Sequence, residues 1–406
     1  MRSTASVWAE ATKAGACPQS APSIVRVDSI PRPLVLLSAL RAGGAERVVV
    51  SLVCRLAQRG LRAALCTLSA EHDSPQLVEE LQVAGVARYD LAASRLGDPR
   101  APVRYLRLIL RQRFDVVHAH GQDAWILASV VRRLVNTPLV LTRHVLDESA
   151  DTWRESARRR WALAAARHAD ALVAPSFATA DRLGELAGLC ASRVHVIPNG
   201  IDLEKFEASA SASRREEVRL GLGLGTSEKM VVLPAVLRPG KGHTVLLAAL
   251  PAIRARVPDA RVLFVGDGQE GVELRELAQS HGVLFLGHRD DLPDLLRACD
   301  LVVLPSFSEA LPTVLIEAAA AGRPVVATRV GGTTDIVEHG TTGLLVPPGD
   351  PDALAEAIVA LLADPRTAEA FGRAGRLVAY ARFSLDGHVD RTLDLWSRLA
   401  TVRRRS

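Results

Sequence analysis

The feature that most constrains the fold of this 406-residue chain is a strand-and-helix rhythm that runs through it twice. From about residue 33, short apolar runs such as "PLVLLSAL" and "DVVHAHG" alternate with amphipathic stretches such as "AERVVVSLVCRLAQRG". The polar segment 203–229 interrupts this rhythm, which then restarts with "MVVLPAVL" and "DLVVLPS". Strands that are apolar throughout are buried on both faces, as in a parallel sheet. The sequence therefore predicts an α/β protein with two doubly wound halves.

The same pattern sets the expected domain boundaries. We expect a disordered leader at 1–31, a first domain at 32–205 and a second domain at 206–383. An amphipathic C-terminal helix at 384–406 is expected to pack back towards the first domain. Open parallel sheets bind ligands at the carboxyl ends of their strands. Residues that directly follow strands, around a cleft between the halves, are therefore the candidates for chemistry.

Composition narrows the class of protein. Apolar residues make up 48% and charged residues 23%, which is ordinary for a soluble globular chain. No run approaches the roughly 18 apolar residues of a membrane-spanning helix. The five cysteines include no C-x-x-C pair, which disfavours a disulfide framework and suits a reducing cytosol. The net charge of +5 permits an anionic ligand or membrane surface without demanding nucleic acid. We expect a cytoplasmic protein with no nucleic-acid partner, peripheral at most on the inner face of the cell membrane.

Two glutamates eight positions apart stand out in "SEALPTVLIEAAAAG". Glu309 lies in an expected loop, and Glu317 lies in an otherwise apolar helix expected from about Pro312 to Ala320. A buried carboxylate without partners costs several kcal/mol, so Glu317 needs one. The sequence leaves two candidates open, a nearby arginine such as Arg323 or the hydroxyl groups of a ligand. At about 1.5 Å of rise per helical residue the two backbones stand on the order of 10 Å apart, a span that suits an elongated ligand.

Two loops of the second half carry groups suited to phosphates. "RPGKGH" places Arg238 and Lys241 in one short loop after a strand, and two cations there suit a diphosphate. Gly331 and Gly332 follow another strand and precede a helix expected near Thr333, whose free N–H groups would favour a phosphate. Solvated surface charge and an ordinary turn are the alternative interpretations.

The first half contributes a glycine pair and a histidine pair. Gly43 and Gly44 in "LRAGGAER" allow the backbone to approach a ligand closely. His118 and His120 in "DVVHAHG" point to the same face if this run is a strand. A metal pair is conceivable, but no third ligand has convincing spacing. A hydrogen bond to a ligand hydroxyl is the favoured interpretation, and we expect neither a metal nor a cofactor.

A dinucleotide site is a further alternative. "GDGQEG" at 266–271 matches the G-x-G-x-x-G pattern. However, Asp267 and Glu270 would repel a pyrophosphate, and the match does not follow the first strand. We therefore disfavour a nicotinamide site.

The stretch "DTWRESARRRWALAAARHAD" is expected to form a basic helix with Trp153 and Trp161. Its arginines are Arg154, Arg158, Arg159, Arg160 and Arg167. Such a helix can contact an anionic membrane. A solvated helix face is the alternative. The tail arginines 403–405 add to the membrane hypothesis.

These elements together resemble the GT-B glycosyltransferases, specifically the retaining enzymes of family 4 (glycosyl transferases group 1). The resemblance rests on E-x7-E, R-x-x-K-G, "GGAER", "HAH", "PNGID" and GG-x-x-[ED]-I-V, which occur in family order over about 33–402. It departs from the family pattern at Ala310, where glycine is common, and at Asp335, where glutamate is usual. The resemblance implies two Rossmann-like domains that face an interdomain cleft.

The resemblance also implies roles for the candidate residues. Glu317 would bind the ribose hydroxyls of the donor, and Glu309 the hydroxyls of the transferred sugar. Arg238 and Lys241 would neutralise the diphosphate. His120, with His118 as second choice, would approach the donor sugar. The other donor-binding positions that it implies are Gly43, Gly44, Gly242, Leu311, Thr313, Gly331 and Gly332.

The implied reaction moves a sugar from a nucleoside-diphosphate sugar to an acceptor hydroxyl, with retention. Surface polysaccharide, glycolipid or cell-envelope glycan synthesis is the expected context. The expected partners are the donor, a saccharide or lipid-linked acceptor and an anionic membrane surface. Two other classes stay open, a sugar-nucleotide epimerase of the same architecture and a non-catalytic subunit that binds the donor.

Overall fold

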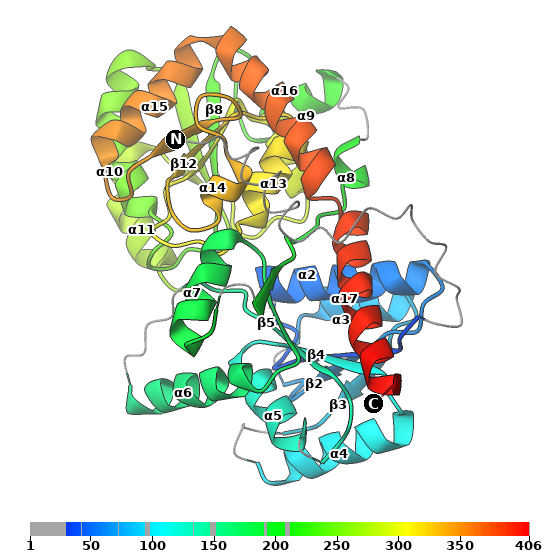
Figure 1. The fold of residues 1–406 in the computed structure, drawn as a ribbon. Helices are drawn as coiled ribbons and strands as arrows, with labels where there is room; N and C mark the ends of the chain where they lie inside the picture. Colours follow the sequence, from blue (N-terminus) through cyan, green and yellow to red (C-terminus); the bar gives the residue numbers. More distant parts are fainter. Residues whose placement is uncertain are drawn as a thin grey trace. The chain divides into compact units, whose positions relative to one another are not determined.

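The computed structural model describes residues 30–41, 43–71, 73–93, 98–132, 134–146, 152–190, 193–207 and 212–405. The expected leader at 1–31 lies almost wholly outside these residues. The described chain forms two compact units, each a parallel sheet covered by helices (Figure 1). We call residues 30–200 with 385–405 the first unit, and residues 201–384 the second unit.

The first unit is built on a seven-stranded parallel sheet in the order β3-β2-β1-β4-β5-β6-β7. Strand β4 lies at the centre, and the neighbouring β1 pairs with β2 on one side and β4 on the other. The strands are β1 (Pro33–Leu37), β2 (Ala64–Thr67), β3 (Ala87–Asp90), β4 (Val116–His120), β5 (Leu139–Thr142), β6 (Ala171–Ala174) and β7 (Val194–Val196). Strands β1, β2, β4, β5 and β6 are buried along their whole length, as expected for parallel strands covered on both faces, whereas the edge strands β3 and β7 are partly exposed.

Two layers of helices cover this sheet. One layer holds α4 (Arg100–Gln112), α5 (Gln122–Arg132), α6 (Trp153–Arg167) and α7 (Phe177–Ala187). The other layer holds α2 (Gly44–Gln58), α3 (Pro75–Val83) and the C-terminal α17 (Leu385–Arg405). Trp396 of α17 is fully buried in the second layer, and Arg55 of α2 pairs with Asp386 at 3.1 Å. These contacts make the C-terminal helix part of the first unit.

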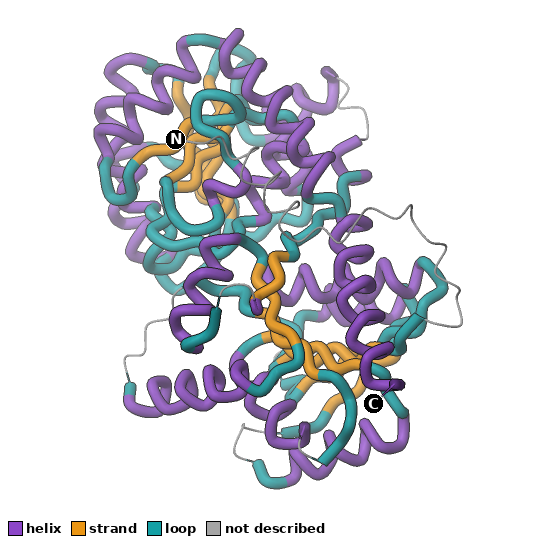
Figure 2. Tube along the Cα trace, viewed as in Figure 1, coloured by secondary structure: helices purple, strands orange, loops and turns teal. Residues whose placement is uncertain are grey.

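The second unit is built on a six-stranded parallel sheet in the order β10-β9-β8-β11-β12-β13. Figure 2 shows the strands at the centre of each unit, with helices outside them. The strands are β8 (Lys229–Pro234), β9 (Ala260–Val265), β10 (Leu284–Phe285), β11 (Leu301–Leu304), β12 (Val325–Thr328) and β13 (Leu344–Val346). Because β11 lies beside β8, loops far apart in the chain meet at the carboxyl edge of this sheet.

Helices cover both faces of the second sheet as well. One face carries α10 (His243–Arg256), α11 (Gly271–Leu277) and α15 (Pro351–Ala363). The other face carries α8 (Glu204–Glu207), α9 (Ala212–Gly221), α12 (Leu292–Ala298), α13 (Thr313–Ala320), α14 (Thr333–Ile336) and α16 (Pro365–Arg382). A short 3-10 turn, η3, spans Gln279–His281. No described helix is both long and apolar enough to cross a bilayer.

The structure differs from the sequence-based expectation in two details of organisation. Strand β3 was missed because it lies at the sheet edge, is half exposed and lacks an apolar run. The units change over at 200/201 and 384/385, a few residues from the expected 205/206 and 383/384. The backbone N–H of Ile201 donates to Phe383 O at 2.9 Å, so the two ends of the second unit are tied together.

Candidate functional site

An ion pair joins two loops at the carboxyl edge of the second sheet. Lys241, in the loop after β8, donates from Nζ to Glu309 Oε1 at 2.6 Å. The Lys241 side chain is 15% exposed and the Glu309 side chain 9% exposed. The backbone N–H of Phe307 donates to Gly240 O at 2.8 Å and fixes the same two loops to each other. The structure therefore brings together two residues to which the sequence assigned separate roles.

Glycine is required where these loops touch. Gly242 has a φ of +75°, and a Cβ at this position would overlap the backbone oxygen of Pro305. Arg238 opens the same loop and is exposed. Its guanidinium has no hydrogen bond or ion pair with any residue that the structure describes. The two cations thus differ, since Lys241 is held by Glu309 while Arg238 is available to an incoming anion.

Glu317 lies on the second turn of α13, as expected, but it is half-buried rather than buried. Its neighbours Leu315, Ile316 and Ala318 are fully buried. The helix therefore packs against the core with its other side, and Glu317 lies at the edge of its apolar face. An ion pair with Arg323 is not formed, because no described residue bonds to the Arg323 guanidinium, whose Nε is buried. The puzzling carboxylate of this motif is therefore Glu309, which is the buried one and is satisfied by Lys241.

The glycine pair after β12 reaches the Glu309 loop through the backbone. Gly332 N–H donates to Glu309 O at 3.0 Å, and Gly331 has a φ of +44°. Thr333 Oγ1 donates to Thr328 O at 2.7 Å and closes the turn. The helix that follows, α14, is a single turn, so little helix dipole is available for a phosphate. Any contribution of this loop to anion binding rests on its backbone geometry.

The backbone that follows Glu309 is well enclosed. Leu311 is 5% exposed, and Thr313, the first residue of α13, is half-buried. Pro312 occupies the N-cap position with an extended ψ of 106°, so the helix begins one residue later than expected. Residues 309–313, 238–242 and 331–332 therefore form one cluster of loops within the second unit.

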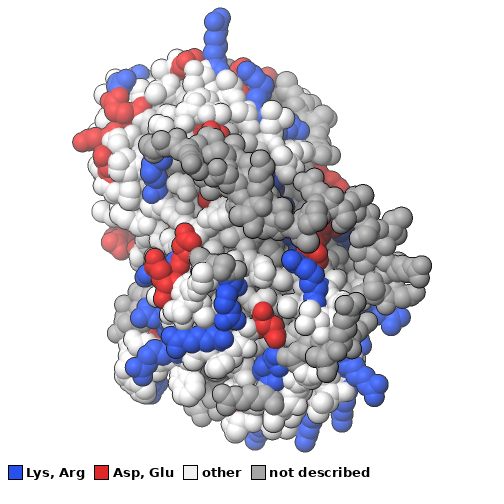
Figure 3. Space-filling view, viewed as in Figure 1, with Lys and Arg blue, Asp and Glu red and all other residues white. Residues whose placement is uncertain are grey.

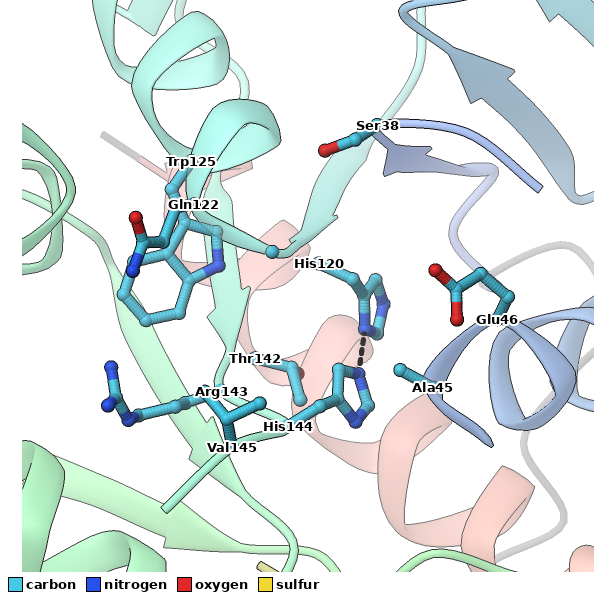
Figure 4. Close-up of a pocket in the computed structure, with 11 residues that line it drawn as sticks. Ser38, Ala45, Glu46, His120, Gln122, Trp125, Thr142, Arg143, His144 and Val145 are labelled. Carbon is cyan, nitrogen blue, oxygen red and sulfur yellow. Dashed lines mark hydrogen bonds between the residues drawn. The ribbon is translucent and has the colours of Figure 1, made fainter. Parts of the chain in front are cut away.

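The histidine pair of the first unit is buried in a network of side chains. His118 and His120 lie on one face of β4, with ring centroids 4.2 Å apart. His118 Nε2 lies 2.6 Å from Thr142 Oγ1 on the neighbouring β5. His120 Nδ1 lies 2.8 Å from His144 Nε2 (Figure 4). Burial is the main cause that lowers the pKa of His118 to about 3 and that of His144 to about 4. These rings are therefore neutral near physiological pH.

His144 is a candidate that the sequence analysis missed. It lies just after β5, the strand beside β4, and its ring stacks on His120 with centroids 5.1 Å apart. Its position two residues after the apolar run "PLVLT", close to a strand end, is the signal that could have pointed to it. Both histidines line a cavity of about 160 Å³ together with Ser38, Glu46, Gln122 and Trp125 (Figure 4). His120 Nε2 and His144 Nδ1 are buried without a hydrogen-bond partner in the described chain, so a ligand can bond to them.

The loop that contains Gly43 and Gly44 in the first unit lies next to the carboxylate of Glu46. Helix α2 begins at Gly44, and Gly43 takes the N-cap position. The Glu46 carboxylate folds back so closely that a Cβ on Gly43 would overlap it, whereas Gly44 faces open space. Burial raises the pKa of Glu46, against its backbone hydrogen bond and the charge of Arg41. A phosphate that approaches Gly43 would therefore meet Glu46, while Gly44 stays accessible.

The G-x-G-x-x-G pattern has a packing explanation. A Cβ at Gly266 would overlap Ala235 O, and one at Gly268 would overlap Leu237 O. Asp267 accepts a hydrogen bond from His288 N–H at 2.7 Å and so ties its loop to the segment after β10. These glycines serve the contact between neighbouring loops, and the expectation that this is not a nicotinamide site stays a prediction.

A metal centre finds no support in the described residues, where no group of three or more His, Cys, Asp or Glu side chains is placed to hold an ion. The expectation that the protein works without a metal stays a prediction.

Comparisons with known proteins identify relatives for both units. A Glycosyltransferase Family 4 model matches residues 42–205, and a Glycosyl transferases group 1 model matches residues 228–364. The D-inositol 3-phosphate glycosyltransferase of Kribbella flavida is 32% identical over 370 residues, which cover 82% of this chain and 85% of the relative.

Solved structures agree with these matches. Anabaena Alr3699/HepE in complex with UDP-glucose superposes with a TM-score of 0.79 and 26% identity, covering 91% of this chain and 100% of that one. Sucrose-phosphate synthase from Thermosynechococcus elongatus shares the fold, with a TM-score of 0.75 and 23% identity over 91% of this chain and 100% of that one.

Proposed function

The chain belongs to the GT-B glycosyltransferases of family 4, and from this premise we propose that it transfers a sugar from a nucleoside-diphosphate sugar to an acceptor hydroxyl with retention. The transferase class follows from its relatives, which are named as glycosyltransferases and not as epimerases. The observation that supports the donor site is the ion pair between Lys241 and Glu309 at the carboxyl edge of the second sheet.

The donor diphosphate is proposed to exchange partners with this ion pair. Arg238, exposed and without a partner among the described residues, would attract the diphosphate first. The phosphates would then draw the Lys241 ammonium away from Glu309. The freed Glu309 carboxylate would accept hydrogen bonds from hydroxyls of the transferred sugar, and Glu317 would hold the ribose. Fixed cations next to the leaving diphosphate stabilise the charge that develops as the glycosidic bond breaks.

Retention is proposed to follow from a reaction on one face of the sugar. The bond from the anomeric carbon to the diphosphate oxygen breaks, and the acceptor oxygen forms its bond on the same face. The departing phosphate takes the acceptor proton. Glu309 is not assigned as a covalent nucleophile in this scheme, because its carboxylate accepts hydrogen bonds from the hydroxyls of the transferred sugar once Lys241 has moved to the phosphates. His120 and His144 would bond to sugar or acceptor hydroxyls in the cavity of the first unit.

The best-supported donor is a uridine diphosphate sugar, because HepE, at 25–26% identity, was solved with UDP and with UDP-glucose. Several relatives about 30% identical carry inositol 3-phosphate in their names, so this compound is the first acceptor to test. A role in surface polysaccharide, glycolipid or cell-envelope glycan synthesis, carried out in the cytoplasm, completes the proposal.

The proposal is tested by thermal-shift titration with UDP, GDP, ADP and their glucose conjugates. A ligand that binds only the folded state raises the melting temperature, and we expect one base to do so. Glu317→Ala should abolish the shift, while Glu276→Gln, an exposed glutamate in the same unit, should leave it unchanged. Nucleotide release should depend on an added acceptor. Sugar transfer would be contradicted if no nucleotide raised the melting temperature, or if nucleotide release did not depend on an added acceptor.

A further inference from the structure

One layer of helices in the first unit concentrates positive charge. Helices α4, α5, α6 and α7 pack side by side in this order on one face of the sheet. Helix α4 with the residue after it carries Arg100, Arg104, Arg107, Arg111 and Arg113 and no acidic residue. Helix α6 carries Arg154, Arg158, Arg159, Arg160 and Arg167 against Glu155 alone. The net charge of these ten arginines and one glutamate is larger than the net charge of +5 of the whole chain. The rest of the protein is therefore net negative.

These charges lie on the outside of the layer. Arg107, Arg111 and Arg160 are exposed and make no hydrogen bond or ion pair with any described residue. Figure 3 shows blue side chains along the lower rim of this unit, where Figure 1 places α4 and α6. Tyr105 and Ile109 of α4 are buried against the sheet. The helix therefore turns its apolar side inwards and leaves a row of cations that the protein itself does not neutralise.

Large apolar side chains interrupt this basic surface. Trp153 is 75% exposed and Trp161 is 69% exposed, both on α6. The other described tryptophans, Trp125 and Trp396, are at most 2% exposed. On α4, Leu110 is 60% exposed between two arginines. A fold that buries its other described tryptophans exposes two on the same layer as ten arginines, although each leaves a large apolar area in water.

We propose that this surface, which we call the α4–α6 face and define by the exposed residues of α4 and α6, binds an anionic lipid bilayer. Arginines are attracted to anionic headgroups within a Debye length of the surface, and indole rings lie well at the boundary between headgroups and acyl chains. A nucleic acid would use the arginines but offers no apolar layer for Trp153, Trp161 and Leu110. The acceptor could then reside in the bilayer. The binding itself does not depend on sugar transfer, so the two can fail separately.

The test is flotation of the full-length protein with vesicles. We expect binding to vesicles that contain phosphatidylglycerol and none to phosphatidylcholine alone. Raising the salt until the Debye length falls from about 10 Å to about 3 Å should release the protein. Neutralising one arginine should weaken binding about fivefold, so the triple variant Arg107→Gln/Arg111→Gln/Arg160→Gln should bind about a hundredfold more weakly. Trp153→Ser/Trp161→Ser should remove the blue shift of tryptophan fluorescence on binding.

A matched control comes from α16 in the second unit. Arg366→Gln/Arg373→Gln/Arg376→Gln removes three exposed arginines from that helix and should leave binding unchanged. Equal losses in the two triple variants would overturn the proposal, since net charge alone would then account for binding. Binding to duplex DNA as tight as to anionic vesicles, with no fluorescence shift on the vesicles, would also overturn it. So would the absence of vesicle binding by the unmodified protein.

Discussion

Lys241 Nζ lies 2.6 Å from Glu309 Oε1, and the two residues are 68 positions apart in the sequence. The pair exists because β8 and β11 are neighbours in the second sheet, so the loops that follow them meet. Both side chains are mostly shielded from water, so either charge is costly without the other. Two of the candidate donor-site groups therefore form an ion pair whose charges cancel.

Removing one partner of this pair should destabilise the protein. Lys241→Met leaves the Glu309 carboxylate enclosed without a counter-charge, and we expect a loss of about 3–5 kcal/mol in the free energy of unfolding. The double variant Lys241→Met/Glu309→Leu should recover most of this loss. Arg256→Met, which breaks the exposed pair with Glu356, should cost about 0–1 kcal/mol. Urea unfolding measures all three. A similar cost for Lys241→Met and Arg256→Met would show that the buried pair is not special.

Two glycines of the same loop allow two costs of a substitution to be measured separately, the cost of a positive φ and the cost of a steric overlap. Gly240 has a φ of +85° with open space around it, and Gly242 has a φ of +75° with Pro305 against it. Gly240→Ala should cost about 1–2 kcal/mol for the left-handed conformation alone. Gly242→Ala should cost at least about 1 kcal/mol more, because Pro305 is backbone and cannot move aside cheaply. Thermal melting of the two variants checks this order. Equal melting temperatures of the two variants would mean that the loop of Pro305 can move away from residue 242 without a cost in stability.

The buried histidines should make the first unit sensitive to acid. Burial is the largest cause that lowers the pKa of His118 to about 3, and those of His144 and His388 to about 4. The unfolded chain, with histidine pKa values near 6.5, binds protons first as the pH falls. Stability is therefore complete above about pH 6.5 and declines towards about pH 4, by up to roughly 3 kcal/mol for each histidine.

A variant series identifies the source of this pH dependence. His388→Gln should flatten the decline between about pH 6.5 and about pH 4 by close to one proton, since it removes one buried titrating ring. His168→Gln, an exposed histidine of the same unit, should not change it. Urea unfolding followed by circular dichroism at several pH values gives the slope. If both variants keep the full slope, protonation of the buried ring is not the cause.

Arg323 and Arg219 should respond in opposite ways to the same substitution. Arg219 is 4% exposed and donates to the backbone oxygens of Ala298 and Gly225, besides pairing with Asp300 at 3.2 Å. Arg323→Met should change stability little or raise it by about 1 kcal/mol. Burial is the largest cause that lowers the pKa of Arg323, and its guanidinium forms no ion pair or hydrogen bond within the described chain, although the charge of Asp300 acts on it from a distance. Arg219→Met should cost about 3–5 kcal/mol. Denaturant midpoints decide, and a large loss at Arg323 would reveal a partner.

The sequence by itself determined the α/β class, the two halves and the loops that hold the candidate residues. Buried parallel strands require continuous apolar runs, and such runs predicted all but one of the described strands. Strand β3 did not, because an edge strand needs no apolar run. Glycines at Gly242 and Gly331 marked tight loops, because few other residues adopt a positive φ.

Only the tertiary structure decided which of these residues meet. Neither the bond between Lys241 and Glu309 nor that between His120 and His144 can be inferred from positions along the chain. Each depends on which strands are neighbours, and the order of strands in a sheet is settled by long-range packing. The burial of a side chain also depends on this long-range packing. Glu309 is therefore the buried carboxylate and Glu317 the half-buried one, although the sequence indicated the reverse. Local pattern chooses the elements, whereas the free energy of burying them against one another chooses the contacts.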